Sequence, residues 1–395
     1  MARIKYITER NGIITMDSAI QKIVSAETKR QKNTIELIAS ENFTSADIMK
    51  LCGSVFTNKY AEGLPGRRFY NGCENADDIE RLAIDYATRI FGCQFANVQP
   101  HSGANANLAV FKAFLTPGDI ILGMDLANGG HLSHGSHVNI SGAWFRSAKY
   151  HVDANGIIDY AEVEKLALEH KPKMIIAGAS AYSKAIDWQF FRTVADKVGA
   201  VFLADVSHYS GLIVGGAYPS PFPHADVVTT TTHKTLRGPR GGLILWNKEE
   251  YSSKINNAIF PGTQGGPLMH IIAAKAQCFY EAMDKEFAVY AKSVVSNAQA
   301  MVDEFKKAGV TIISNGTDCH MFTIDLSTEK YSGKAYANLL EEQGITVNKN
   351  AVPGELRSFV ETSGIRIGTA AETTRGHNEE WFRELATRMV KLLRS

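Results

Sequence analysis

A run of β-branched residues, 227–232, ends directly before His233-Lys234 and a turn rich in glycine and proline. Valine and threonine favour extended backbone, so this run predicts a strand, and residues 243–246 after the turn predict a second one. Lys234 then stands at the carboxyl end of a strand. A lysine there is commonly a solvated turn residue, but a surface turn does not require four consecutive threonines behind it. The alternative to a solvated lysine is that the amine of Lys234 carries a bound group. Such a group requires further polar residues at the same edge of the sheet.

Apolar segments of strand length alternate with helical segments through much of the chain. Most of these strands are apolar throughout, which is typical of strands buried on both faces, and a strand, a helix and a second strand in succession give a parallel pair. The sequence therefore predicts an α/β fold with a mostly parallel sheet between layers of helices. The predicted strands are residues 96–99, 120–124, 174–179, 201–204, 227–232 and 243–246, and the helices 79–91 and 190–198 lie among them.

The composition excludes several classes of protein. The 395 residues carry a net charge of +1 without a basic stripe, so neither nucleic acid nor an anionic membrane is an expected partner. No segment is apolar enough to span a bilayer, and the first twelve residues lack the apolar core of an export signal. The five cysteines form no C-x-x-C pair, which favours the reducing cytoplasm over a disulfide framework or a zinc site.

Polar residues follow several of the predicted strands at their carboxyl ends, where ligands of parallel sheets bind. Ser180 follows one strand, Asp205 and His208 follow another, and Lys234 follows the threonine run. Each alone has an ordinary explanation as a helix cap or a core residue. Together with the helix start at residues 102–104, they supply an amine for an aldehyde, a carboxylate for a pyridine nitrogen, a hydroxyl for a phenolic oxygen and N–H groups for a phosphate. Pyridoxal phosphate requires this set of contacts, so the sequence predicts that Lys234 carries it.

The loop at residues 127–135 contains two histidines. His131 is a candidate for stacking on the cofactor ring. A metal site at His131 and His134 is the alternative, but no cysteine or carboxylate accompanies them at ligand spacing, so we expect no metal.

Outside the predicted sheet, three further segments are informative. Residues 17–31 predict an amphipathic helix that lies either across a partner subunit or on the surface. The loop 58–72 combines a carboxylate, aromatic residues and paired arginines, a composition typical of functional loops. Residues 268–307 are strongly helical in pattern, and a smaller domain follows with strands near 310–314 and 321–326 and helices at 333–344 and 378–393. In that domain Arg366 lies between glycines, where it either grips a substrate carboxylate or forms a surface salt bridge.

Several long segments resemble serine hydroxymethyltransferases, which are fold-type I pyridoxal phosphate enzymes. The resemblance implies a large domain with a mostly parallel seven-stranded sheet at residues 33–280, a smaller α+β domain at 281–395, and an N-terminal helical arm at 1–32. It extends over almost the whole chain and rests on Glu36-Leu-Ile-Ala-Ser-Glu-Asn, Asn58-Lys-Tyr-Ala-Glu-Gly, Asn97-Val-Gln-Pro-His-Ser-Gly, Gly129-Gly-His-Leu, residues 229–235, Gln264-Gly-Gly-Pro and Thr362-Ser-Gly-Ile-Arg.

The resemblance also implies a role for each matching residue. Lys234 would form the Schiff base, with Asp205 on the pyridine nitrogen, His131 on the ring face, and Ser180 and His208 near the phenolic oxygen. The phosphate would lie among Ser102, Gly103, Ala104 and His233, joined by Gly265 and Gly266 of a partner subunit. Ser40 and Arg366 would hold the substrate carboxylate, and Tyr60, Glu62 and Tyr70 would form a catalytic loop that reaches the other subunit. Leu126, Gly130, Leu132 and Asn350 match positions that contact folate.

The implied reaction is the reversible transfer of the hydroxymethyl group of serine to tetrahydrofolate, with cleavage of the bond from Cα to Cβ. The products are glycine and 5,10-methylenetetrahydrofolate, and the unit is a homodimer with shared active sites, or a tetramer. Two alternatives use the same cofactor site: a folate-independent aldolase or hydroxymethyltransferase for a variant β-hydroxy or α-methyl amino acid, and a homologue that binds the cofactor without catalysis. The departures from the family pattern that bear on the acceptor are Leu64, Phe69, Asn128, Ser207 and Glu361.

Overall fold

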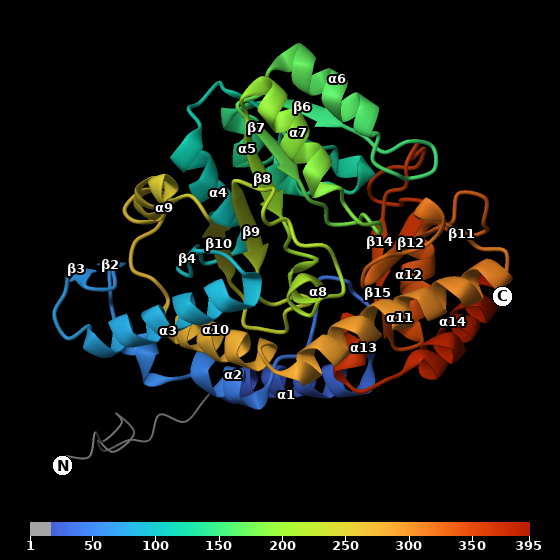
Figure 1. The fold of residues 1–395 in the computed structure, drawn as a ribbon. Coiled ribbons are helices and arrows are strands. Elements are labelled where there is room, and N and C mark those ends of the chain that lie inside the picture. Colours follow the sequence, from blue (N-terminus) through green and yellow to red (C-terminus); the bar gives the residue numbers. More distant parts are fainter. Residues whose placement is uncertain (1–16) are drawn as a thin grey trace.

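The computed structural model describes residues 17–395 and is organised around a seven-stranded sheet (Figure 1). The strand order is β4-β10-β9-β8-β7-β5-β6. β10 is antiparallel to both of its neighbours, and the other pairs are parallel. This confirms the predicted α/β fold and its mostly parallel sheet. The strands are β4 (Phe95–Asn97), β5 (Ile120–Met124), β6 (Arg146–Tyr150), β7 (Met174–Ala177), β8 (Val201–Asp205), β9 (Val227–Thr231) and β10 (Gly242–Trp246).

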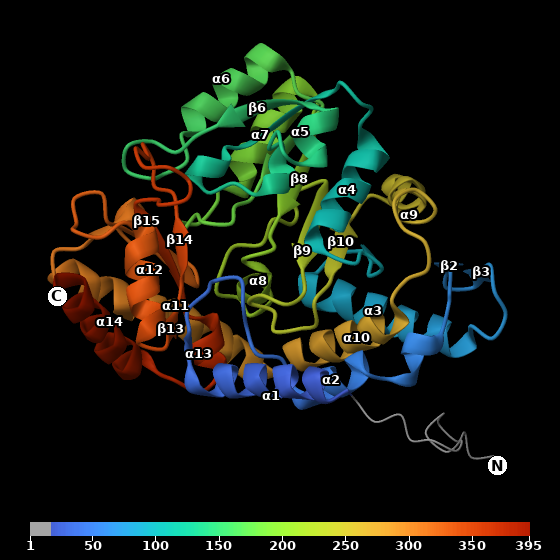
Figure 2. The ribbon, with the colours of Figure 1, turned by 180° about the vertical axis from the view of Figure 1, so that it is seen from behind.

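Helices cover both faces of this sheet, as a parallel sheet requires. In β8, Phe202 and Ala204 belong to one hydrophobic core, whereas Leu203 between them belongs to the core on the opposite face. The helix α4 packs against β9, β10 and α9, while α10 packs against α3 and α2 (Figures 1 and 2). The helices of this part are α2 (Ala46–Cys52), α3 (Glu74–Phe91), α4 (Gly103–Phe114), α5 (Ile140–Trp144), α6 (Tyr160–His170), α7 (Trp188–Val198), α8 (Ser210–Val214), α9 (Ser252–Ile259) and α10 (Met269–Ala282).

A second, smaller sheet and a separate core lie toward the C-terminal end of the chain. The sheet order is β11-β12-β15-β14, and all its pairs are antiparallel. The long helix α11 joins the two cores, because Val294 packs in the first and Phe305 in the second. The elements are α11 (Lys285–Lys307), β11 (Thr311–Ile312), β12 (Met321–Asp325), α12 (Gly333–Glu342), β13 (Ile345–Thr346), β14 (Asn348–Asn350), β15 (Gly364–Gly368), α13 (Ala370–Thr374) and α14 (Glu379–Arg394).

The N-terminal part of the chain packs against the C-terminal part before the chain enters the large sheet region. The strand β1 (Ile35–Glu36) pairs in parallel with β13, and Leu37 is buried in the second core. The segment that follows therefore lies where the two cores meet. The predicted domain limits, 33–280 and 281–395, stay a prediction, with β1 and α11 as the elements shared between the two parts.

The predicted N-terminal helix is α1 (Ser18–Asn33), and it begins after Asp17, whose carboxylate accepts from the N–H groups of Ala19 and Ile20. None of its residues is buried, and Ile20 and Ile23 are among its exposed apolar side chains. The helix lies along the edge of the molecule beside α2 (Figure 2). Residues 1–16 of the predicted arm lie outside the described residues.

The predicted helical segment at 268–307 is confirmed and consists of two helices, α10 and α11, because Asp284 accepts from the N–H of Glu286 and starts α11 anew. The predicted strand at 310–314 shortens to β11, since Ser314 and Asn315 adopt left-handed backbone with φ of 63° and 51°. No helix in residues 17–395 is long and apolar enough to cross a membrane.

Candidate functional site

A cavity of about 420 Å³ opens at the carboxyl ends of β7, β8 and β9. Ten of the predicted site residues line it together: Ser40, Ser102, Gly103, Ala104, His131, Ser180, Asp205, His208, His233 and Lys234. Six more that were not predicted as site residues complete the lining: Glu41, His134, Ala179, Ser207, Thr231 and Arg240. The fold thus gathers residues from far along the chain at one edge of the sheet, as a parallel sheet predicts.

The amine of Lys234 is held inside this cavity. Its side chain is buried, with 8% of the residue exposed, so it is not the solvated turn residue of the alternative interpretation. The backbone carbonyl of Lys234 accepts from Asn42 and from the N–H of Arg237, which fixes the turn after β9. Burial lowers the pKa of Lys234 to about 8, an effect that Asp205 opposes and Arg366 reinforces. About a tenth of this amine is therefore in the neutral, nucleophilic form at pH 7, far more than for a lysine with an ordinary pKa.

The threonine run before Lys234 has a structural explanation. Its four hydroxyls donate to acceptors inside the protein: Thr229 to Asn107, Thr230 to the carbonyl of Thr231, Thr231 to the carbonyl of Ser207, and Thr232 to that of Pro239. These bonds tie β9 to α4 and to the loops on either side of the cavity. Of the four, Thr231 alone lines the cavity. The row of hydroxyls thus serves mainly to fix the backbone around Lys234.

Asp205 is a buried carboxylate with a full set of donors. Its Oδ2 accepts from Asn107 Nδ2 at 2.9 Å and from His134 Nε2 at 3.0 Å, and its Oδ1 accepts from the N–H and the hydroxyl of Ser207 at 3.1 and 2.6 Å. Burial by itself raises the pKa of this carboxyl, but the hydrogen bonds from His134 and Ser207 outweigh it, and the pKa lies well below its ordinary value. Asp205 is therefore an anion at all physiological pH values.

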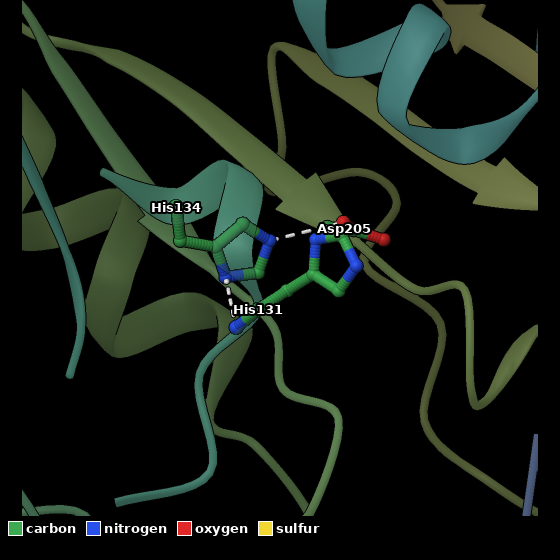
Figure 3. Close-up of side chains that lie close together, drawn as sticks. All are labelled: His131, His134 and Asp205. Carbon is green, nitrogen blue, oxygen red and sulfur yellow. Dashed lines mark hydrogen bonds and ion pairs between the residues drawn. The ribbon is translucent and has the colours of Figure 1, made fainter. Parts of the chain in front are cut away.

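The two histidines of the 127–135 loop lie beside Asp205, and their hydrogen bonds fix their protons (Figure 3). The N–H of Ser133 donates to His131 Nδ1, so that nitrogen is unprotonated. The N–H of His131 donates to His134 Nδ1 in the same way, which leaves the proton of His134 on Nε2, facing Asp205. Burial also lowers the pKa of His131 to about 4. The ring of His131 is consequently neutral.

The argument against a metal at these histidines was incomplete. The carboxylate missing from the local sequence comes from β8, and His131, His134 and Asp205 each place one ligand atom within 4.8 Å of the others. In this arrangement His134 Nε2 already donates to Asp205 and His131 Nδ1 is bound to Ser133, so the set is satisfied as a hydrogen-bond network. That no metal binds here stays a prediction.

The start of α4 forms the other wall of the cavity. Ser102 caps the helix by accepting from the N–H of Asn105, and a Cβ at Gly103 would lie 2.7 Å from Thr231 Cγ2. Behind this segment Lys275, which is fully buried, donates to the carbonyls of Val98, Pro100 and Gly242. The loop is thus rigidly braced, and glycine is the residue that fits where it approaches β9.

His233 and Arg240 line the same cavity as the start of α4. His233 has a buried Nδ1 with no hydrogen-bond partner among the described residues, and burial lowers the pKa of this ring to about 3. Arg240, six residues after Lys234 in the same glycine-rich turn, also lines the cavity. The sequence analysis did not predict Arg240, although its place in that turn was a usable signal. A helix N-terminus, an arginine and an unpaired histidine nitrogen together suit a phosphate group.

Arg366 is a buried cation without a carboxylate partner in residues 17–395. Its Nε donates to Asn348 Oδ1 at 2.9 Å and its Nη1 to the carbonyl of Ser180 at 2.6 Å, and no salt bridge forms. Burial lowers the pKa of this guanidinium to about 10. The surface salt bridge of the alternative interpretation is therefore wrong. A buried, uncompensated guanidinium next to Ser180 is suited to an anionic ligand.

The predicted catalytic loop lies apart from this cavity in the single chain. Tyr60, Glu62, Tyr70, Gly265 and Gly266 line no part of the cavity around Lys234. They lie against one another instead: Tyr60 Oη donates to Glu62 at 3.3 Å, the rings of Tyr60 and Tyr70 are 5.5 Å apart, and a Cβ at Gly266 would lie 2.9 Å from the Tyr60 ring.

This second cluster is ordered by an ion-pair network. The side chain of Arg68 donates to Asp77, to Glu80 and to the carbonyls of Ala61 and Gly63, so the loop is fixed to α3 within one chain. The negative charge of Glu62 raises the pKa of Tyr70. The predicted site residues thus form two separate groups, one around Lys234 and one around Glu62.

The predicted folate positions surround the 127–135 loop rather than the cavity. Leu126 and Leu132 are exposed, Gly130 is buried, and Asn350 lines a small cavity with Asn128 and Gly129. Two departures from the family pattern have structural partners. Asn128 Oδ1 accepts from the N–H of Val152, and Glu361 accepts from Ser332 at the start of α12 and pairs with Lys334. Neither Asn128 nor Glu361 lines the cavity around Lys234.

A mostly parallel sheet with a buried lysine and a buried aspartate at its carboxyl edge defines a fold-type I pyridoxal phosphate enzyme. The model of the serine hydroxymethyltransferase family matches residues 13–389. The chain belongs to this family, whose members use pyridoxal phosphate as cofactor and tetrahydrofolate as co-substrate.

Relatives named serine hydroxymethyltransferase are similar to the chain over nearly its whole length. The protein of Wolbachia sp. subsp. Drosophila simulans (strain wRi) is 54% identical over 97% of this chain and 90% of the relative. The protein of Lactobacillus gasseri is 54% identical over 95% and 92%, and that of Novosphingobium aromaticivorans is 55% identical over 94% and 85%.

The residues of the cavity fit pyridoxal phosphate. The permanent anion of Asp205 is suited to a protonated pyridine nitrogen, and the glycine cradle with its adjacent basic groups is suited to the phosphate. Lys234 lines the same cavity and would supply the amine for the aldehyde. The contacts of these residues come from the structure itself, and they agree with the family to which the chain belongs.

The lowered pKa of Lys234 predicts how the apoprotein takes up the cofactor. The neutral amine is the nucleophile, so the uptake rate should rise up to about pH 8 and level off above about pH 9. Stopped-flow absorbance measures this rate, and the reaction of pyridoxal phosphate with Nα-acetyl-lysine in the same buffers corrects for the ionisation of the cofactor. A corrected rate that keeps rising through pH 10 would show that the amine has an ordinary pKa.

Proposed function

We propose that this chain catalyses the reversible transfer of the hydroxymethyl group of serine to tetrahydrofolate, giving glycine and 5,10-methylenetetrahydrofolate. The observation that carries the proposal is the pairing, in one cavity, of the buried amine of Lys234 with the buried anion of Asp205. Bound pyridoxal phosphate supplies an electron sink for cleavage of the bond from Cα to Cβ.

The roles that we propose follow from charge. Asp205 stabilises a positive pyridine nitrogen, because its own pKa is too low for it to take up the proton. The uncompensated guanidinium of Arg366, with Ser40, holds the carboxylate of the amino acid. His131 packs on the cofactor ring, and Ser180 and His208 lie near the phenolic oxygen. Ser102, Gly103, Ala104 and His233 hold the phosphate.

We further propose that the working unit is a homodimer, with a tetramer as the alternative assembly. The division of the site residues into two separate clusters supports this, since Glu62 and Tyr70 are away from Lys234 in one chain. A partner would supply Tyr60, Glu62 and Tyr70, with Glu62 handling the proton of the serine hydroxyl, and Gly265 and Gly266 beside the phosphate. The exposed apolar side chains of α1 are consistent with an arm that lies on a second subunit.

Family membership supports folate as the acceptor. The contacts of the residues that depart from the family pattern support it as well. Asn128 and Glu361 are bound to other parts of the chain, Phe69 packs on Phe260 at 5.3 Å, and Leu64 lines a different cavity. Ser207 hydrogen-bonds to Asp205 on the cofactor side. None of these contacts favours a folate-independent aldolase or an inactive homologue. Leu126, Gly130, Leu132 and Asn350 remain our proposed folate contacts.

We place the protein in the cytoplasm. Its cysteines at positions 52, 73, 93, 278 and 319 are all free, which suits a reducing compartment.

The reaction is tested by serine turnover with and without tetrahydrofolate. We expect glycine formation that requires tetrahydrofolate and that falls about 10³-fold or more in Lys234→Ala. Glycine and methylenetetrahydrofolate are both quantified, and circular dichroism verifies that the variant folds. Equal turnover without tetrahydrofolate would favour the aldolase, and an unchanged rate in Lys234→Ala would contradict the assignment of the site.

The shared site is tested by mixing two inactive variants. Lys234→Ala and Glu62→Gln each lack one group, and a mixed dimer with shared sites has one intact site. Random exchange of subunits should therefore restore about a quarter of the wild-type activity. Mixing Lys234→Ala with the double variant Lys234→Ala, Glu62→Gln is the matched control. Recovery no greater than in this control, with exchange verified by mass spectrometry, would show that both groups act within one chain.

A further inference from the structure

Two buried histidines lie in contact behind the cavity. His208 follows β8 and lines the cavity, whereas His320 immediately precedes β12 of the smaller sheet. The Nδ1 of His208 is 3.2 Å from the Nε2 of His320, and that same Nε2 is 3.2 Å from the carbonyl oxygen of Ala39. His320 thus contacts both the cofactor side of the cavity and the segment that carries Ser40.

Both rings are neutral. Burial and the nearby cations Lys234 and Arg366 lower the pKa of His208 well below its ordinary value. Burial and Arg366 likewise lower the pKa of His320 to about 3. Within residues 17–395 no carboxylate is hydrogen-bonded to either ring. Each imidazole therefore carries one proton, and its position decides which nitrogen donates.

The carbonyl of Ala39 fixes the proton of His320. A carbonyl oxygen only accepts, so the Nε2 that faces it carries the proton. The other tautomer would direct the lone pair of Nε2 at this oxygen and would leave a proton on Nδ1, which is buried without a partner among the described residues. A buried donor without an acceptor is costly, which disfavours that tautomer.

The proton of His320 in turn determines the state of His208. Its Nε2–H lies between two acceptors at equal distance, the oxygen of Ala39 and the Nδ1 of His208. Because Nδ1 accepts, the single proton of His208 is on its Nε2. We propose that His320 is a positioning residue that fixes this tautomer, so that His208 offers an N–H donor to an anionic oxygen in the cavity.

The phenolic oxygen of pyridoxal phosphate is the anionic oxygen that this donor would meet, and this assignment rests on the proposed function. An N–H at that place stabilises the deprotonated oxygen, whereas a bare ring nitrogen would repel it. The tautomer itself is a property of the protein alone. The same Nε2–H also holds the carbonyl directly before Ser40, which couples the substrate side of the site to the cofactor side.

The tautomer is tested by nitrogen NMR on the full-length apoprotein labelled with [15N]histidine. The His208 signals are identified by their loss in His208→Asn. In the wild type we expect an unprotonated Nδ1 and a protonated Nε2. The amide of His320→Gln can donate to both acceptors and should preserve this state, whereas His320→Leu should give a mixture of tautomers. A protonated Nδ1 in the wild type, or an unchanged tautomer in His320→Leu, would overturn the proposal.

A second measurement separates positioning from a general loss of structure. We expect His320→Leu to weaken binding of pyridoxal phosphate about 3- to 10-fold, and to leave binding of 3-deoxypyridoxal phosphate, which lacks the phenolic oxygen, unchanged. His320→Gln should bind both as the wild type does. Equal weakening for both compounds would show a merely structural role. Failure of wild-type protein to bind either compound would contradict the proposed function, while the NMR result would stand.

Discussion

The buried carboxylate of Asp205 is the constraint on which the rest of the site depends. A charge inside a protein is costly unless donors surround it, and here three segments supply them: Asn107 from α4, His134 from the loop after β5, and Ser207 from the loop after β8. Each donor residue is held by a further bond: Thr229 donates to Asn107, the N–H of His131 donates to His134, and Thr231 donates to the carbonyl of Ser207. Stabilising one anion therefore fixes the walls of the cavity.

Two cations around the cavity, Lys234 and Arg366, form no ion pair within residues 17–395, and Asp205 offsets the effect of burial on the pKa of Lys234 only in part. Lys234 and Arg366 are buried, and burial lowers the pKa of both. Arg366 donates to neutral oxygens only. A site that holds cations without partners has affinity for anions, and a phosphate and an amino-acid carboxylate are the anions that the proposed reaction brings. The lowered pKa of Lys234 also keeps this amine reactive.

The residues that could be predicted from the sequence are those whose role is indicated by their immediate neighbours in the chain. Lys234, Asp205 and Ser180 were predictable because each follows a predicted strand, and the carboxyl ends of parallel strands meet. The helix capped by Ser102 and the strand with Arg366 had equally local signals. The threonine run was correctly associated with the site, but for an incomplete reason, because its hydroxyls mainly brace the backbone.

The residues that the sequence did not reveal act through distant partners. Asn107 lies in the interior of a helix, and nothing in its neighbourhood indicates that it meets Asp205. His134 was considered only as a metal ligand, because its carboxylate partner lies 71 positions away. His320 is 112 positions from His208 and belongs to the other sheet. The break between α10 and α11 was missed since both helices are apolar on one side and the cap at Asp284 is a single side chain.

The central claim is that Lys234 is the residue joined to the cofactor, and chemical trapping tests it most directly. The holoenzyme is reduced with borohydride, digested, and analysed by mass spectrometry for a phosphopyridoxyl group. The account predicts one modified residue, Lys234. Lys275 is the competing site, because it is also buried and burial lowers its pKa to about 7. Modification of Lys275 or of a surface lysine, with Lys234 unmodified, would contradict the account.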